Sequence, residues 1–362
     1  MNGHILGIST AVPKHSISQN EALNMALDVF SLEASQQEQM KKVFQNSGIE
    51  KRHIVTPELK KDRKEWHFWG QDYPKTIPGM TERNEMYKKE SLLLAHEAAE
   101  KAIQAWGGDP ATLTHVISVS CTGVVIPGID FLLIDSLGLK RSISRLGINF
   151  MGCFGAFKGL EVAQVFAKEN SKNRILVVCT ELCSLHLQAD LSPDTIVANS
   201  IFADGAAAVV VGSHPSSKEK PLWEIVKSSC FGLEETGEHM SWEASNQGFL
   251  MRLSGAVPLI ISRHIQKFAN ELQGSHTNPA ACNWAIHPGG RAILQVIEKK
   301  MRLEKSQTQA SWDTLKNYGN MSSATFLFVL DNLSKQKEAL NWTTGIGFGP
   351  GLSMEGILLK GE

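Results

Sequence analysis

Two stretches near the middle of the chain, RILVVCT at residues 174–180 and AAAVVVG at residues 206–212, decide the fold. Each is an uninterrupted apolar run of strand length, without the polar alternation of a strand that faces water on one side. Before the first run, residues 155–168 carry apolar side chains at helical spacing. Buried strands that alternate with helices predict an α/β fold in which both faces of the sheet are covered.

The same alternation continues toward both ends of the chain. In the first half we expect a strand over 3–12, a helix over 18–30, a polar irregular region over 51–90, a helix over 89–106 and a strand over 115–120. In the second half we expect a helix over 256–273, a strand over 283–286, a helix after Gly290 and an apolar helix over 322–333. A polar connection at 213–220 separates the halves, which we expect to span residues 1–212 and 222–362. Their similar content suggests an internal duplication.

Composition limits the classes of protein that are compatible with this chain. Its 362 residues are 42% hydrophobic and 20% charged, as in a globular protein with a large core. Lys and Arg number 36 against 37 Asp and Glu, so no broad basic surface is available for nucleic acid. The six cysteines show no zinc-site spacing, which favours reduced thiols in a cytoplasmic protein. We expect no membrane span, because no apolar run reaches about 20 residues.

Three polar residues lie where an α/β fold presents reactive groups. Cys153 lies in NFMGCFGA at 149–156, ahead of a predicted helix whose N-terminus would lower the pKa of a thiol below about 8.5. His287 lies in WAIHPGG at 284–290, at the end of a predicted strand. Asn320 lies in YGNMSSA at 318–324. The alternatives are a buried structural cysteine, a structural histidine and a helix N-cap, for which Asn is a preferred residue.

Two further segments have structural explanations as well. The glycine-rich stretch GIGFGPG at 345–351 predicts a bent loop that leaves room for a ligand, or else an ordinary tight connection. It lacks the Lys-Ser/Thr pair of a phosphate-binding loop, which argues against nucleotide binding. The basic cluster at residues 60–64 is interspersed with acidic residues and is interpreted as a solvated face.

Taken together, these segments resemble the type III polyketide synthases, the chalcone synthase-like branch of the thiolase superfamily. The resemblance covers nearly the whole chain. Five motifs in the family's order carry it: GCF at 152–154, FADGAAA at 202–208, HPGG at 287–290, YGNMSSA at 318–324 and GFGPG at 347–351. It implies a thiolase-like five-layered αβαβα fold built from two similar halves, a homodimer, and CoA thioesters as substrates without a metal or redox cofactor.

The resemblance also implies a role for individual residues. Cys153 becomes the nucleophile that carries an acyl group, with His287 and Asn320 as its catalytic partners. These two would stabilise the enolate that forms when malonyl-CoA loses carbon dioxide, and the enolate would attack the acyl group. Phe202 becomes an aromatic gatekeeper of the pocket. The other residues that we expect around the substrate are Thr122, Cys183, His186, Ser322, Gly349, Pro350 and Gly351.

Several positions depart from the plant enzymes of this family. Met251 lies where they carry a second gatekeeper phenylalanine, and Trp242 lies where they have glycine, so we expect a reshaped pocket. In the region that resembles the family's CoA-binding helix, Gln39, Lys42 and Asn46 align with positions that are basic in the family, and only Lys42 of these three is a cation. An acyl-carrier protein could therefore replace CoA as donor of the starter.

Other condensing enzymes and a non-catalytic role are the alternatives. A β-ketoacyl-acyl-carrier-protein synthase III would share Cys153, His287 and Asn320, but the surroundings of Asn320 and the 349–351 turn fit the polyketide branch better. Degradative thiolases need a second catalytic cysteine near the C-terminus, whereas the last cysteine here is Cys282. A non-catalytic partner subunit would be expected to have lost its nucleophile. Alkylresorcinols, phloroglucinols and pyrones are the expected classes of product.

Overall fold

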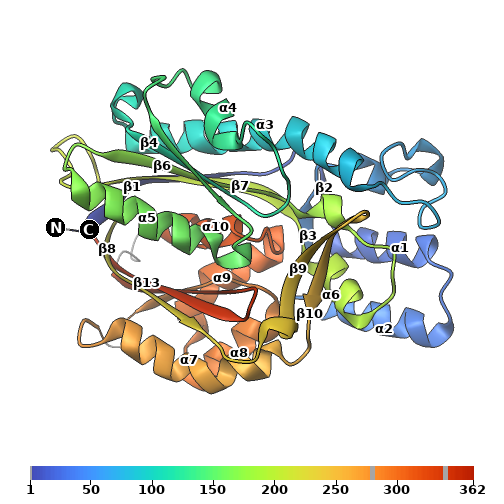
Figure 1. Ribbon diagram of the computed structural model, residues 1–362. Coiled ribbons are helices and arrows are strands. Elements are labelled where there is room, and N and C mark those ends of the chain that lie inside the picture. Colours follow the sequence, from blue (N-terminus) through green and yellow to red (C-terminus); the bar gives the residue numbers. More distant parts are fainter. Residues whose placement is uncertain (1, 278–281, 337–340) are drawn as a thin grey trace.

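The computed structural model describes residues 2–277, 282–336 and 341–362. Its helices and strands form five layers, in which helices cover both outer faces and two more helices lie in the middle (Figure 1). The main strands form one nine-stranded sheet of order β11-β12-β13-β8-β1-β7-β6-β4-β5. This arrangement confirms the predicted five-layered α/β fold.

The N-terminal half of the sheet contains both runs that decided the fold. Its strands are β1 (Gly3–Ala11), β4 (His115–Ser120), β5 (Ser144–Asn149), β6 (Arg174–Leu182) and β7 (Asp204–Gly212). Every residue of β6 and β7 is buried, as a strand covered on both faces requires. The outer face of this half of the sheet is covered by α3 (Met80–Trp106) and α4 (Ile129–Ser136). The edge strand β5 carries mostly exposed side chains, which explains why no apolar pattern predicts it.

The C-terminal half repeats the strand directions of the first. It contains β8 (Trp223–Gly232), β11 (Asn283–Ile286), β12 (Trp342–Gly349) and β13 (Ser353–Gly361). In this half β11 is parallel to β12, and the next two pairs, β12–β13 and β13–β8, are antiparallel. The N-terminal half has the same order of directions: β4 is parallel to β6, and the next two pairs, β6–β7 and β7–β1, are antiparallel. The two halves join where β1 pairs with β8. This shared pattern is what a duplicated unit would produce.

Helices of both halves complete the layers. The middle layer contains α5 (Gly155–Glu169) and α10 (Ala324–Ser334), whose Phe157 and Phe326 rings stack with centroids 4.0 Å apart. On the second outer face lie α7 (Val257–Gln273) and α8 (Arg291–Met301), and α9 (Lys305–Tyr318) packs against β11 and α10. Because both faces of the sheet are buried, the reactive groups emerge only where strands end and helices begin.

A smaller region lies at one end of the layers and borders the site described below (Figure 1). It contains α1 (Gln19–Val29), α2 (Ala34–Gln45), α6 (Pro193–Ile201), the short pair β2 (Ser16–Ser18) and β3 (Lys51–His53), and the hairpin β9 (Met240–Ser245) and β10 (Gly248–Leu253). Single 3₁₀ turns occupy Pro57–Lys60, Arg63–Glu65, Pro110–Thr112, Gly152–Phe154, Cys183–His186 and Gly237–His239.

One long helix begins earlier than its apolar pattern predicts. We expected a helix from residue 89, but α3 begins at Met80. Its first turns bury Arg83, Tyr87 and Ser91, so the face that packs inward is polar and gives no hydrophobic periodicity. Arg83 Nε donates to the carbonyl of Pro78 at 2.8 Å, and its guanidinium lies over the Trp69 ring. Hydrogen bonds therefore stabilise this end of the helix where apolar packing does not.

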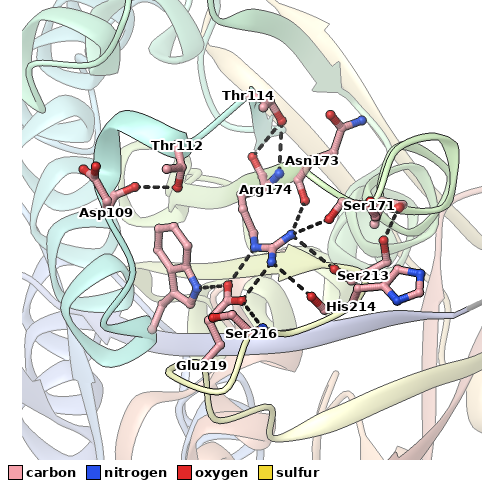
Figure 2. Close-up of polar contacts among 12 residues, drawn as sticks. Asp109, Thr112, Thr114, Ser171, Asn173, Arg174, Ser213, His214, Ser216 and Glu219 are labelled. Atoms are coloured by element: carbon pink, nitrogen blue, oxygen red, sulfur yellow. Dashed lines mark hydrogen bonds and ion pairs between the residues drawn. The ribbon is translucent and has the colours of Figure 1, made fainter.

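The connection between the halves is held by a buried ion pair at the start of β6. Arg174 Nε and Nη2 donate to the two carboxylate oxygens of Glu219 at 2.7 and 2.8 Å, and Trp106 Nε1 donates to the same carboxylate at 2.7 Å (Figure 2). Burial alone would raise the pKa of Glu219, but the hydrogen bonds from Arg174 and from the Ser216 N–H lower it to about 2. The predicted polar connection is thus anchored to the sheet.

Candidate active site

Cys153 lies in a tight 3₁₀ turn between β5 and α5. Gly152 precedes it with φ +70°, and a Cβ there would lie 2.3 Å from Cδ of Pro350, so only glycine fits this turn. At Gly155, the first residue of α5, a Cβ would lie 2.7 Å from the Val119 side chain. Both glycines let the turn pack closely against the sheet. The Cys153 thiol is buried at the N-terminal end of α5.

His287 lies at the end of β11. Its backbone N–H donates to the carbonyl of Ile346 at 2.8 Å, which continues the pairing of β11 with β12. The side chain is only 1% exposed, and neither ring nitrogen has a hydrogen-bond partner within the described residues. A buried imidazole without a partner is costly in a folded protein, so its nitrogens are available for a ligand.

Asn320 lies beside Cys153 and is not a helix cap. Its backbone N–H donates to the carbonyl of Ile201 at 2.9 Å, and its carbonyl accepts from the Ala203 N–H at 2.9 Å, which fixes it next to the end of α6. The N-cap of α10 is Ser323, and the Asn320 side chain lies three residues before it. The alternative that Asn320 caps this helix is therefore wrong. Its Oδ1 accepts from the Ser322 N–H at 2.9 Å, and its Nδ2 lies 4.0 Å from Cys153 Sγ.

Burial keeps both ionisable groups of this trio neutral. It raises the pKa of the Cys153 thiol to about 11 and lowers the pKa of His287 to about 3. The expected lowering of the thiol pKa by the helix N-terminus is outweighed, because desolvation acts on the whole charge and the helix end supplies only a partial one. Transfer of the thiol proton to His287 would form an ion pair in which each charge offsets the burial of the other.

A cavity of about 400 Å³ is lined by this trio and by residues of α2 and α8. Cys153, His287 and Asn320 line it together with Phe202 and Met251. The rest of its wall is mainly apolar and comes from α2, α6, β10, α7 and α8. The structure therefore gathers five of the predicted residues, from both halves of the chain, around one space.

Two water-sized voids, of about 30 and 20 Å³, adjoin this cavity. Thr122, Ser322 and Pro350 line the first, His186 lines the second, and Cys183 lines both. Phe202, Trp242 and Met251 also line both voids. Phe202 and Met251, which also line the larger cavity, therefore lie between it and the voids. Trp242 lies between the two voids.

Trp242 is half-buried and fixed in position by one hydrogen bond. It pairs with Met251 across the β9–β10 hairpin, and its Nε1 donates to the carbonyl of Cys121 at 2.9 Å. Its ring centroid lies 5.7 Å from His186 and 6.4 Å from Phe202. The indole is therefore a wall of both voids, the larger of which Cys153 also lines.

His186 and Thr122 serve mainly to hold the backbone around the voids. His186 Nε2 bonds the carbonyl of Thr122 at 2.8 Å, and its Nδ1 accepts from the Phe249 N–H at 3.1 Å. Burial lowers the pKa of His186 to about 4, so the ring is neutral. Thr122 Oγ1 donates to Glu181 Oε2 at 2.8 Å.

The sequence analysis did not identify Glu181, a charged residue in a strand whose residues are all buried. It is fully buried at the end of β6 and accepts hydrogen bonds from the Cys121 N–H at 2.9 Å and from Thr122 and Ser323. Burial raises its pKa to about 7 although these hydrogen bonds oppose the shift. A carboxylate directly after the apolar run at 174–180 was the signal that could have identified it.

The glycine-rich stretch is mostly a strand, and the expectation of a loop is wrong for residues 345–349. A Cβ at Gly345, Gly347 or Gly349 would lie 2.4 to 2.6 Å from a neighbouring side chain, which for the last two is an aromatic ring, Phe157 or Phe154. These glycines therefore permit close packing of β12 rather than a bend. The turn itself begins at Pro350, and Gly351 has φ +96°. Gly349 and Gly351 do not line the cavities described above.

Lys42 does not line the cavity. It is exposed on α2, with its Nζ 3.8 Å from Glu38 Oε1, whereas Asn46 does line the cavity. Arg291, the first residue of α8, lines it too and was missed by the sequence reasoning. The sequence feature that could have identified Arg291 is its position directly after HPGG, where a helix is predicted to begin.

Other sequence expectations concern cysteines, metals and membranes. All six cysteines are unpaired, as predicted. Across residues 2–277, 282–336 and 341–362, His, Cys, Asp and Glu side chains form no group of three that could hold a metal ion. Within that same part of the chain, no helix combines the length and apolar character needed to cross a bilayer.

Comparison with known proteins identifies the family. The family models for the N-terminal and C-terminal domains of chalcone and stilbene synthases match residues 2–215 and 224–362. Probable polyketide synthase 1 of Dictyostelium discoideum is 37% identical over 366 residues, which cover 99% of this chain but 11% of that protein. This chain thus spans about a tenth of the length of that relative.

Two solved structures have the same fold over the full chain. The C-terminal type III polyketide synthase domain of Steely1, a type I/III hybrid from Dictyostelium, is 36% identical with a TM-score of 0.92, covering 100% of this chain and 99% of that one. PKS-I from the brown alga Ectocarpus siliculosus is 29% identical with a TM-score of 0.92, covering 100% and 98%. The chain therefore belongs to the chalcone and stilbene synthase family of type III polyketide synthases.

Proposed function

We propose that this enzyme loads an acyl starter on Cys153 and extends it by decarboxylative condensation with malonyl-CoA. The observation that carries the proposal is a buried His287 without hydrogen-bond partners among the described residues, in one cavity with Cys153 and Asn320. The N-terminal half, residues 1–212, supplies the nucleophile, and the C-terminal half, residues 222–362, supplies the other two groups. The reaction centre thus requires both halves.

In the proposed loading step, Cys153 exchanges one thioester for another. Its Sγ bonds to the acyl carbonyl carbon as the thiol proton moves to His287, and the bond from that carbon to the CoA sulfur breaks. The CoA thiolate leaves and takes a proton from the imidazolium. Burial alone keeps both Cys153 and His287 neutral. His287 can act as the base in this transfer because its side chain and that of Cys153 line the same cavity.

In the proposed extension step, His287 and Asn320 act on malonyl-CoA. The malonyl carboxylate leaves as carbon dioxide, and its bonding electrons form an enolate at the thioester. The Asn320 amide and a His287 N–H donate hydrogen bonds to the enolate oxygen, an arrangement whose individual donors contribute about 10²–10³-fold to such reactions. The enolate carbon then attacks the acyl carbonyl and releases the Cys153 thiolate, which regains a proton from water.

The proposed products are alkylresorcinols, phloroglucinols or pyrones. The mainly apolar wall of the 400 Å³ cavity supports an apolar starter and a short polyketide chain. Either acyl-CoA or an acyl-carrier protein would supply the starter. The family's substrates are CoA thioesters, and its chemistry requires no metal or redox cofactor.

Product analysis tests the proposed function directly. Purified protein is incubated with malonyl-CoA and a panel of acyl-CoA starters, and the products are identified by mass spectrometry. We expect polyketides that contain the starter and two or more malonyl-derived units. Acylation of a cysteine other than Cys153, or condensation by the Cys153→Ala variant, would contradict the assignment.

We infer that the chain forms a homodimer through the end of the sheet at β4 and β5. Ile126 and Val124, in the loop after β4, are 93% and 50% exposed, and Phe150 after β5 is 50% exposed. Because β4 and β5 are parallel neighbours, these loops lie at the same edge, and β5 itself ends the described sheet. Such an apolar edge is a typical protein interface.

Sedimentation equilibrium tests the dimer. We expect a dimer for the wild type and a monomer for Ile126→Asp, and an unchanged mass for this variant would refute this interface.

We also propose that the protein is cytoplasmic. The unpaired cysteines support this location, because thiols stay reduced in the cytosol.

A further inference from the structure

The catalytic cavity has one cation without an ion-pair partner. Of the described residues that line it, only Asp194 and Arg291 carry a full charge. Asp194 Oδ2 accepts a hydrogen bond from the Leu253 N–H at 3.1 Å. The Arg291 guanidinium has no carboxylate within 4.0 Å in the described part of the chain, and the residue is exposed at the rim of the cavity.

Arg291 also lies where the backbone favours an anion. It is the first residue of α8, and residues 289–293 all line the cavity, so the N-terminal end of this helix opens onto the same space. The first N–H groups of a helix have no partners within it and carry a partial positive charge. The Arg291 side chain therefore adds a full charge to this partial one.

The stem of Arg291 lies beside Gly48. A Cβ on Gly48 would lie 3.4 Å from Arg291 Cβ and 3.7 Å from its Cδ. Gly48 thus lets the loop after α2 lie against the Arg291 stem, and Asn46 and Ser47, just before Gly48, line the cavity wall together with Arg291. On α2 itself, Lys42 is outside this wall and close to Glu38.

We propose that Arg291 binds a phosphate of the carrier arm of the thioester substrate. This inference rests on the proposed function, because it requires that a thioester enters this cavity. A guanidinium can donate two parallel hydrogen bonds to a phosphate, which Lys cannot match. The same chemistry serves CoA and the phosphopantetheine arm of a carrier protein. Arg291 thereby supplies at this cavity the cation that Lys42 on α2 does not.

The test compares substrates with and without phosphate. We measure KM and kcat for decarboxylation of malonyl-CoA and of the malonyl thioester of N-acetylcysteamine, which has no phosphate. Arg291→Gln should raise KM for malonyl-CoA on the order of fivefold, the upper range for an exposed ion pair, with kcat little changed. It should leave the N-acetylcysteamine thioester unaffected. Arg291→Lys should be intermediate, and Lys299→Gln at the other end of α8 should behave as wild type.

Further substrates show which phosphate Arg291 contacts. An equal effect of Arg291→Gln on malonyl-phosphopantetheine and malonyl-carrier protein supports contact with the pantetheine phosphate, and an effect on malonyl-CoA alone supports contact with a nucleotide phosphate. Equal losses with the N-acetylcysteamine thioester, or an effect of Lys42→Gln instead of Arg291→Gln, would overturn the inference. Calorimetric binding of CoA requires no turnover: weaker binding by Arg291→Gln supports the role of Arg291 even if no condensation is found, and unchanged binding refutes it.

Discussion

Trp242 should limit the length of the polyketide that this enzyme makes. The indole lines both small voids, of about 30 and 20 Å³, the larger of which Cys153 also lines, and its ring centroid lies 6.4 Å from that of Phe202. Trp242→Ala would remove a ring far larger than either void and would join both into one space beside Cys153. We therefore expect products with at least one more malonyl-derived unit, or acceptance of bulkier starters.

The cost in stability can be separated from the gain in space. Truncation of a buried Trp costs about 3–5 kcal/mol, and because Trp242 is half-buried we expect a loss of about 3 kcal/mol in free energy of unfolding for Trp242→Ala. Trp242→Phe keeps most of the wall but loses the 2.9 Å bond to the Cys121 carbonyl, which costs about 1 kcal/mol. This variant should therefore keep the wild-type products.

The assay combines product mass spectra, denaturant unfolding and the rate of malonyl-CoA decarboxylation. The decarboxylation rate should change little in both variants, because His287 and Asn320 line the larger cavity and Trp242 lines only the voids. Unchanged products of Trp242→Ala, together with a lower free energy of unfolding, would refute the reasoning and leave Trp242 as a packing residue only.

Four other residues give sharp expectations. Cys153→Ala should abolish condensation in the product assay while carbon dioxide release from malonyl-CoA continues, because in the proposed mechanism the enolate needs only His287 and Asn320. His287→Ala or Asn320→Ala should slow decarboxylation by about 10²-fold or more, whereas a merely structural role of Asn320 would lower the free energy of unfolding and leave turnover intact. Because burial raises the pKa of Cys153 to about 11, alkylation of this thiol in His287→Ala should require higher pH than in wild type, and identical pH profiles would exclude proton transfer to His287. Glu219→Gln should lower the free energy of unfolding at pH 7 by about 2 kcal/mol. Since the pKa of Glu219 falls to about 2 on folding, from about 4.3 in the unfolded chain, its contribution is complete above that unfolded value and is lost as pH falls toward 2, so unfolding curves of the two proteins should converge in acid.

Local pattern predicts the elements that are buried on every side. The strands β6 and β7, the helix α5 and the strand β11 lie close to where their apolar runs predict them, because burial of the side chains dictates these runs directly. Elements with exposed or polar inward faces, such as β5 and the first turns of α3, carry no such pattern. The turn around Cys153 was also predictable, since its flanking glycines permit close packing whatever lies opposite.

What only the tertiary structure decided is which distant groups share a space and what their surroundings do to them. Nothing local indicates that Asn320 Nδ2 lies 4.0 Å from Cys153 Sγ, that Glu181 binds Thr122, or that Arg291 and not Lys42 lines the cavity. The neutral state of Cys153 and His287 likewise follows from burial by residues far away in the chain. Side-chain periodicity records only whether a residue faces inward, whereas pairing of strands and packing of layers decide what it meets there.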